Sequence, residues 1–346
     1  MPSRLLFLLR LVFGFWMLCC LNASACAYDL HAPVYPITYT DAQKNVQREA
    51  GRAVVKQIDA AIRSGAKEFT VPPGVYRLPA AKEEGNIALW KVKGFTFRLA
   101  HTEFILENGG AFLYPIDWSD IAILGPVKFD AEALVYTQGT LRRYDPVTGV
   151  STVEIMPGYE VGEAEKGTVD AFSPSGVYLA NPLWAGYTDA KVIDRERRLI
   201  QVKLGAKDTV FTSIYKPGVL LAMRLHGSPL FLSAGNIHNL TVRDADIYTG
   251  SGFMWGGGTG NFSFVHVRGI RRPGTNRLMG AGGCQVGNYG GNVTFDGCEF
   301  SNTADDLVDY YGGGLFLCER QEDARTILVW CGKLALGDTV NLYERI

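Results

Sequence analysis

The sequence predicts an all-β protein, a right-handed parallel β-helix solenoid with an N-terminal capping helix and a β-rich insertion. Three observations lead to this prediction. Short strand-like runs recur between Gly, Asn or Asp residues, and only one long helical pattern is present. Three runs, starting at residues 239, 261 and 292, share the frame Asn, apolar residue, Thr or Ser, apolar residue. Their starts lie 22 and 31 residues apart, which is typical of stacked coils with loops of variable length.

The chain begins with the features of an export signal. An apolar run over residues 5–21, interrupted by Arg10, follows a positive start and leads to the small residues Ala25-Cys26-Ala27. The run is short for a membrane span. We therefore expect residues 1–27 to be a signal peptide that is cleaved before Tyr28.

The rest of the chain, residues 28–346, is expected to be a single secreted or periplasmic β-helix domain. A lipid on Cys26 is the alternative, and it would tether the protein to a membrane. Loss of Arg4 and Arg10 with the leader changes the net charge from −1 to −3, so no basic field is left to hold nucleic acid. We expect no membrane span in the mature chain, and the sequence leaves the oligomeric state open.

One amphipathic helix is expected over about residues 41–64, ending at Gly65. Apolar residues recur there every four positions on one face: Val46, Ala50, Val54, Ile58 and Ile62. The first coil of a solenoid exposes an open edge and an apolar end, so we expect the helix to cap it.

Two regions depart from the repeat. Residues from about 131 to 232 break the period and are rich in turn residues, which predicts a β-rich insertion, either a small subdomain or long loops. The chain stops at Ile346 directly after a strand-like run at 338–342. We expect either a partner that covers the last coil or a truncated C-terminus.

Four cysteines remain after removal of the leader, and all lie in the last quarter of the chain: Cys284, Cys298, Cys318 and Cys331. In an oxidising compartment they can pair in three ways, between which the sequence does not choose. Their spacing contains no Cys-x-x-Cys and histidine is scarce there, so we expect no metal site and no cofactor.

Asn239, Asn261 and Asn292 each begin an Asn-x-Thr/Ser sequon. The same asparagines fall at expected coil corners, where Asn suits the backbone of a turn. We favour this structural interpretation, with glycosylation as the alternative in a eukaryotic host.

Asp305 and Asp306 form the centre of the predicted site. Adjacent acids on a strand would point to opposite faces, one of them into the apolar core, so we expect the pair at a corner or bulge. Glycosidic cleavage usually requires two carboxylates around one bond. One coil earlier the neighbouring positions are Gly282 and Cys284, so no further acid lies there. Capping of turn N–H groups is the alternative role of the pair.

Two stretches resemble known families. Residues 53–78 resemble the start of the pectate-lyase-like β-helix superfamily. Residues 239–314 resemble the β-helix glycoside hydrolases that include the blood-group α-galactosidases and, more distantly, the polygalacturonases. The resemblance implies that Asp305 and Asp306 are the catalytic acidic pair, and Arg277 matches an arginine before the family's Ala-Asp-Gly pattern.

The chain departs from that family pattern in two places within the predicted site. Gly282 stands where the family has Asp, and Tyr311 stands where it has the His of His-Gly. Asp309 is a nearby acid that could substitute. Arg277 is expected either to orient substrate or to pair with the acids.

Aromatic residues complete the predicted site. Trp255 and Tyr310 are candidates for a platform on which sugar rings stack, although solenoids also stack aromatic rings internally. His266 lies in an alternating strand, and we interpret it as structural rather than as a base.

The predicted function is that of a secreted, carbohydrate-active protein of the glycoside hydrolase type, with carbohydrate as its partner. The alternative is a non-catalytic glycan-binding or surface protein that has kept the fold. A polysaccharide lyase is the third hypothesis, against which the lack of a basic cluster near the acids argues.

Overall fold

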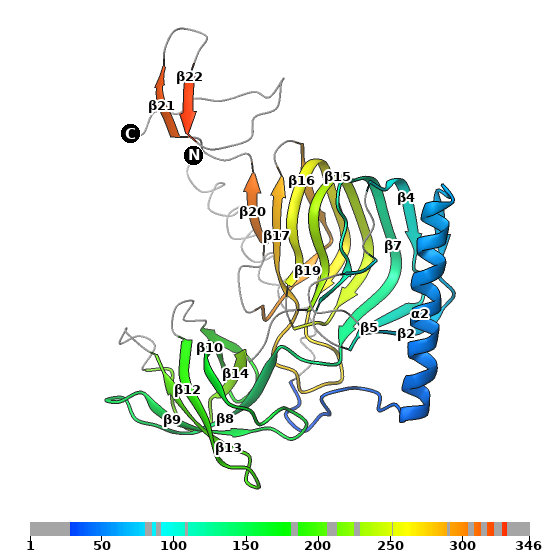
Figure 1. Ribbon diagram of the computed structural model, residues 1–346. Helices are drawn as coiled ribbons and strands as arrows, with labels where there is room; N and C mark the ends of the chain where they lie inside the picture. Colours follow the sequence, from blue (N-terminus) through cyan, green and yellow to red (C-terminus); the bar gives the residue numbers. More distant parts are fainter. Residues whose placement is uncertain are drawn as a thin grey trace, which may run out of the picture.

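The computed structural model describes residues 28–79, 85–87, 91–107, 110–180, 186–205, 213–224, 229–250, 252–288, 291–303, 308–312, 317–321 and 327–330 (Figure 1). The predicted signal peptide and the pair Asp305 and Asp306 lie outside these residues. Within them the chain is mostly β, as predicted, and no helix there is long and apolar enough to cross a membrane.

Helix α2 (Asp41–Arg63) forms where the sequence predicts it. Thr40 is its N-cap, and a capping box joins Thr40 and Gln43, each accepting a hydrogen bond from the backbone N–H of the other. The chain leaves the helix through Gly65, whose φ of 80° is a left-handed conformation that suits glycine.

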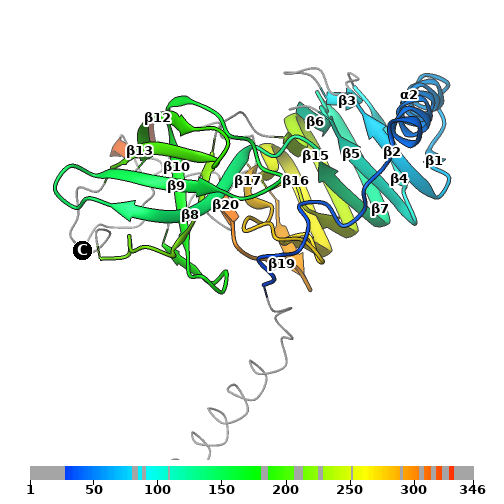
Figure 2. The ribbon, with the colours of Figure 1, turned by 90° about the horizontal axis from the view of Figure 1, so that it is seen from below.

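The inner face of α2 packs against β2 (Gly74–Leu78) and covers the N-terminal end of the parallel strands (Figures 1 and 2). Its buried residues are Gly51, Val54 and Ile58. A Cβ on Gly51 would lie 2.1 Å from the carbonyl oxygen of Arg77, so only glycine permits this close approach. Val46, which the pattern placed on the same face, is 70 % exposed.

The parallel strands stack in three ladders. Ladder A contains β1 (Glu68–Thr70), β4 (Lys93–Arg98), the first half of β7 (Trp118–Ala131), the middle of β15 (Pro229–Ile247) and of β16 (Gly252–Gly269), and β18 (Val293–Asp296). Ladder B contains β2, β5 (Thr102–Leu106), the ends of β7, β15 and β16, and β19 (Glu299–Phe300). Ladder C contains β3 (Gly85–Ile87), β6 (Gly110–Leu113), the starts of β15 and β16, β17 (Gly282–Asn288) and β20 (Val308–Gly312).

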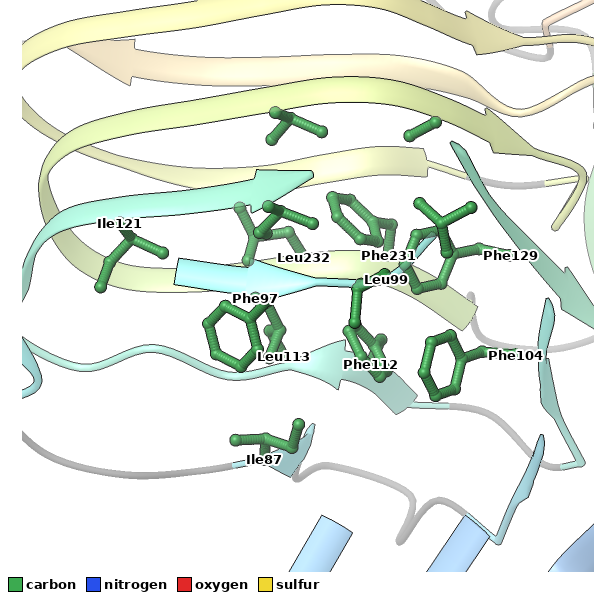
Figure 3. Packing of buried hydrophobic residues seen from close by; sticks show 14 of the residues in the cluster. Ile87, Phe97, Leu99, Phe104, Phe112, Leu113, Ile121, Phe129, Phe231 and Leu232 are labelled. Atoms are coloured by element: carbon green, nitrogen blue, oxygen red, sulfur yellow. The ribbon is translucent and has the colours of Figure 1, made fainter. Parts of the chain in front are cut away.

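Inward residues of successive coils stack into apolar rows inside the ladders. In ladder A one row runs through Phe97, Ile123, Val242 and Phe264, all of them buried. Phe112, Phe129 and Phe231 meet between the ladders (Figure 3). The rings of Phe231 and Phe253 stack with centroids 5.4 Å apart. The stacked ladders and their shared core fit the predicted parallel β-helix.

The predicted insertion is a separate small β-barrel. Between β7 and β15 six antiparallel strands close on themselves, in the order β10 (Ala164–Phe172), β12 (Gly186–Asp194), β13 (Leu199–Leu204), β9 (Val150–Ile155), β8 (Tyr136–Tyr144) and β14 (Leu220–Arg224), which pairs back to β10. β11 (Tyr178–Ala180) adds to β10. The barrel has its own core and lies beside the stack, away from α2 (Figures 1 and 2). Of the two forms left open by the sequence, the structure has the subdomain.

A further two-stranded antiparallel pair, β21 (Leu317–Gln321) and β22 (Ile327–Trp330), follows the last ladder strand. These strands do not continue the parallel ladders within the described residues.

Asparagine side chains tie successive coils together at the corner before ladder A. Asn239 donates from Nδ2 to Oδ1 of Asp120 at 2.8 Å, and its own Oδ1 accepts from the backbone N–H of Asn261 at 2.8 Å. The Oδ1 of Asn261 accepts from the N–H of Asn292 at 3.2 Å. Asp120 and Asn239 have φ near 58°, which Asp and Asn tolerate. The structural interpretation of these asparagines is therefore confirmed.

We expect Gly51→Ala to lower the free energy of unfolding by about 1–3 kcal/mol, because the new methyl group collides with the Arg77 carbonyl. This loss outweighs the gain of about 1 kcal/mol in helix propensity. Urea denaturation measures the change. Lys56→Ala, on the exposed face of α2, is the control and should change stability by less than about 0.5 kcal/mol. A Gly51→Ala variant more stable than the wild type would contradict the close packing.

Asn239→Ala should destabilise the protein by about 2 kcal/mol, because it removes two hydrogen bonds and places alanine in a left-handed conformation. The matched variant Asn292→Ala, at the exposed last rung of the row, should be nearly neutral. Thermal unfolding of both variants checks the difference, and equal losses would argue against the row.

Candidate functional site

Charged side chains of alternating sign follow the outer face of ladder B. One register row across neighbouring strands contains Glu103, Lys128, Asp246, Arg268 and Glu299. The residues that precede them, such as Val127, Ala245 and Val267, are buried, so strand alternation turns this row outward. Neighbouring strands lie about 4.8 Å apart, so the charges stand side by side along the stack.

A second row lies at the corner where the chain turns from ladder A into ladder B. His101, Asp244, His266 and Gly297 occupy this corner with φ of 60°, 55°, 52° and 58°. Left-handed backbone is tolerated best by glycine and by Asn, Asp and His, which explains the residue types found there.

Apart from Glu299 and Gly297, the residues of the two rows line an open groove with a volume of about 560 Å³. Its charged and ionisable lining includes Glu103, Lys128, Asp244, Asp246, His266 and Arg268. These residues come from four different coils, so the groove runs across the strands rather than along one of them.

Ion pairs hold the carboxylates of the groove in place. Arg268 donates from Nε and Nη2 to the two carboxylate oxygens of Asp246, both at 2.7 Å, and Tyr248 donates to the same carboxylate at 3.0 Å. The hydrogen bond to Asp246 raises the pKa of Arg268, and burial raises the pKa of Tyr248. Glu103 pairs with Arg272 at 2.8 Å.

The outer face of ladder B continues from the groove into a smaller cavity of about 140 Å³ beneath residues 35–39. Glu103 borders both cavities. Arg77 is 3 % exposed and pairs there with Glu132, while Arg272 pairs with Asp130. The N-terminal segment therefore covers a network of compensated charges.

The structure gives Arg277 a structural position. It is fully buried, donates from Nη1 to Asp130 at 2.5 Å and from Nε to the Val34 carbonyl at 2.9 Å, and lies over the ring of Tyr35. Burial is the largest influence and lowers the pKa of Arg277, but the charge of Asp130, the hydrogen bond to it and the nearby tyrosines together outweigh burial and raise that pKa. The guanidinium has no exposed surface with which to orient a substrate, so we leave Arg277 out of the proposed site.

Strand register brings two other predicted residues into one row of ladder C. Trp255 pairs with Gln285, which pairs with Asp309, although Trp255 and Asp309 lie 54 residues apart in sequence. Tyr310 occupies the adjacent position, opposite Val286. Their role in a site stays a prediction.

Asp305 and Asp306 fall in the chain between β19 and β20, that is, between a ladder B strand and a ladder C strand. The chain approaches them beside Arg271, whose Nη2 donates to Asn302 Oδ1 at 2.7 Å. Burial lowers the pKa of Arg271, and no carboxylate in the described part of the chain forms an ion pair with it.

Sequence reasoning missed Glu103, Lys128, Asp244 and Asp246, and it interpreted His266 as structural. A signal for them is present in the second strand of each coil. Polar residues alternate there with buried ones, as in Asp244-Ala-Asp246 and His266-Val-Arg268. Aligning those strands by coil, rather than searching for paired acids, would have shown the charged row.

The described residues contain no group of three or more His, Cys, Asp or Glu arranged to hold a metal. Cys298 is a free thiol among them, and burial raises its pKa. The disulfide pairing of the four C-terminal cysteines stays a prediction.

Comparison with known proteins adds little. No family model matches the chain, and no curated protein does. Among solved structures, the Gp54 tailspike of Acinetobacter baumannii bacteriophage AP22, in complex with A. baumannii capsular saccharide, aligns with 72 % of this chain and 43 % of the tailspike chain. The identity is 10 % and the TM-score is 0.20. The chain thus spans less than half of that tailspike, and so low a TM-score supports no conclusion about function.

Arg277→Ala should cost about 3 kcal/mol of unfolding free energy, because it leaves Asp130 buried with part of its charge uncompensated. Arg268→Ala is the matched control. Its ion pair with Asp246 is half exposed and should contribute no more than about 1 kcal/mol. Chemical denaturation of the two variants should separate them clearly, and an equal loss would show that the Arg277 pair is no more important than a surface pair.

Proposed function

We propose that the protein is a carbohydrate-active, right-handed parallel β-helix protein that is exported and binds glycan in the groove of ladder B. The observation that supports this proposal is the groove itself, which is open and carries charged side chains from successive coils, among them the ion pair of Arg268 with Asp246. Sugar hydroxyls both donate and accept hydrogen bonds. An Arg–carboxylate pair such as Arg268 and Asp246 offers a donor and an acceptor side by side.

The repeat of the groove suits a chain ligand better than a compact one. Each coil contributes one corner residue and one strand residue, and the next coil repeats the arrangement about 4.8 Å further on. Equivalent contacts along a line match a polymer of similar units. We therefore propose an oligosaccharide or polysaccharide that lies across the strands.

For the chemical step we propose glycosidic hydrolysis, with Asp305 and Asp306 as acid and base, as the family resemblance implies. Their place in the chain, directly after the ladder B strand β19, supports this assignment. Arg271 supports it too, since its partly buried guanidinium contacts Asn302 near the pair and has no carboxylate partner among the described residues. Asp309, Tyr310 and Trp255, the other residues predicted for the site, belong to ladder C, where Asp309 shares a register row with Trp255. A protein that binds glycan without cleaving it remains the alternative.

A polysaccharide lyase is the second candidate, and Lys128 and Arg268 favour it. β-Elimination from a uronate requires cationic groups that neutralise the sugar carboxylate. The sequence showed no basic cluster near the acidic pair, but the groove contains these two cations. An unsaturated product that absorbs in the ultraviolet would identify a lyase and exclude hydrolysis.

Binding to a panel of purified neutral and anionic polysaccharides tests the groove. We expect Asp246→Asn to weaken the affinity for the glycan that the wild type binds by roughly tenfold or more. The substitution removes a charged hydrogen-bond acceptor and leaves Arg268 without its carboxylate partner. Glu154→Gln is the matched control, since Glu154 is an exposed acid in the barrel that pairs with Arg142 at 2.7 Å. Equal binding by all three proteins would place the ligand elsewhere, and no binding by the wild type would reject the proposal.

Asp306→Asn should abolish release of reducing ends from the bound glycan while the melting temperature and the binding stay unchanged. The reason is that an amide cannot transfer the proton that the carboxyl group transfers. Asp305→Asn is expected to act in the same way, with Glu154→Gln again as control. Turnover that survives both substitutions would contradict hydrolysis by the acidic pair.

A further inference from the structure

Asp244 and His266 form a side-chain pair at the edge of the groove. They occupy equivalent corners of neighbouring coils, and Oδ1 of Asp244 lies 3.0 Å from Nδ1 of His266. An ionised carboxylate only accepts hydrogen bonds, so Nδ1 carries the hydrogen of this contact. The other ring nitrogen, Nε2, is then the one that can exchange a proton with a ligand.

The next corner along the stack leaves that nitrogen accessible. Gly297 stands there, and a Cβ at this position would lie 2.5 Å from Cδ2 and 3.2 Å from Nε2 of His266. Any larger residue would therefore crowd the Nε2 edge of the ring. The side chain of His266 is 64 % exposed and lines the groove.

The backbone does not require histidine at position 266. Its φ of 52° is matched by 55° at Asp244 and 58° at Gly297 in the same corner row, so Asp or Gly satisfies the turn equally well. The turn at this corner therefore does not depend on an imidazole side chain. Asp244 fixes the ring from one side and Gly297 leaves the other side open.

We propose that His266 is the general acid of the groove and that Asp244 is its positioning residue. This inference rests on the proposed carbohydrate function, and it assigns to His266 the proton donation given above to one member of the acidic pair.

The step balances without a cofactor. Protonated Nε2 gives its proton to the glycosidic oxygen while the bond from that oxygen to the anomeric carbon breaks, and the bonding electrons stay with the oxygen. A water molecule adds its oxygen to the anomeric carbon and gives its proton to a carboxylate of the acidic pair, which keeps the role of base; that proton then passes to solvent, from which Nε2 is protonated again. Asp244 holds the ring through its contact with Nδ1, and the other charged groups that line the groove are Glu103, Lys128, Asp246 and Arg268, with His101 as a further titratable group.

The variant His266→Asn tests this role, because asparagine tolerates the left-handed corner but transfers no proton. On the polysaccharide that the wild type binds, we expect kcat to fall by about 10²–10⁴-fold with binding unchanged. His238→Asn is the matched control. His238 is exposed, contacts Thr259 at 2.8 Å and does not line the groove, so its loss should leave kcat unaltered.

Chemical rescue separates proton transfer from a structural role. His266→Gly keeps the corner conformation and leaves space for a free imidazole molecule, so added imidazole should restore part of the lost kcat, and it should not do so for Asp306→Asn. Asp244→Asn should lower kcat less than His266→Asn does.

The outcomes distinguish this inference from the function on which it rests. Wild-type kcat in His266→Asn, or loss without rescue by imidazole, would overturn the role of His266 and leave glycan binding in place. Binding by the wild type with no cleavage of any polysaccharide would also overturn it. Absence of binding would reject the proposed function, and the inference with it.

Discussion

The buried ion pair between Arg277 and Asp130 is the interaction on which the arrangement of the parts depends. Asp130 lies near the end of β7, at the point where the chain leaves the ladders for the barrel. Arg277 joins it to the N-terminal segment through Val34, and the neighbouring Asn276 accepts a hydrogen bond from Tyr159 in the insertion. The ladders, the insertion and the N-terminal segment therefore meet at one buried ion pair. Removal of either partner would leave the other charge buried and unpaired, which costs about 3–5 kcal/mol.

That centre also explains why the outer face of ladder B is divided in two. Residues 35–39 lie over the buried charges and exclude water from them. The covered half keeps only a small cavity, and the half without a cover is the groove. The same side-chain chemistry thus has a structural role on one side of Glu103 and is available to ligands on the other.

The sequence predicted the elements that depend on local pattern. The capping helix, the short repeated strands and the corner asparagines follow from the spacing of apolar residues and from turn chemistry, which act within one coil. Closure of the insertion into a barrel depends on pairing between β10 and β14, which are far apart in sequence. The local sequence pattern of either strand therefore does not predict it. The groove was missed for a related reason, since Asp244 and His266 become neighbours only through the register of two coils. Arg277 was misjudged because its partner Asp130 lies 147 residues earlier in the chain.

The separation of inward and outward positions in each coil has an evolutionary consequence. The core is built from the apolar rows, so a coil can exchange its corner residue and its outward strand residue without disturbing the packing behind them. Each coil thus presents its own outward positions, although exchange of a paired residue such as Asp246 also removes the partner of Arg268 on the neighbouring coil. The outer surface of the stack can therefore vary coil by coil while the apolar rows behind it stay the same.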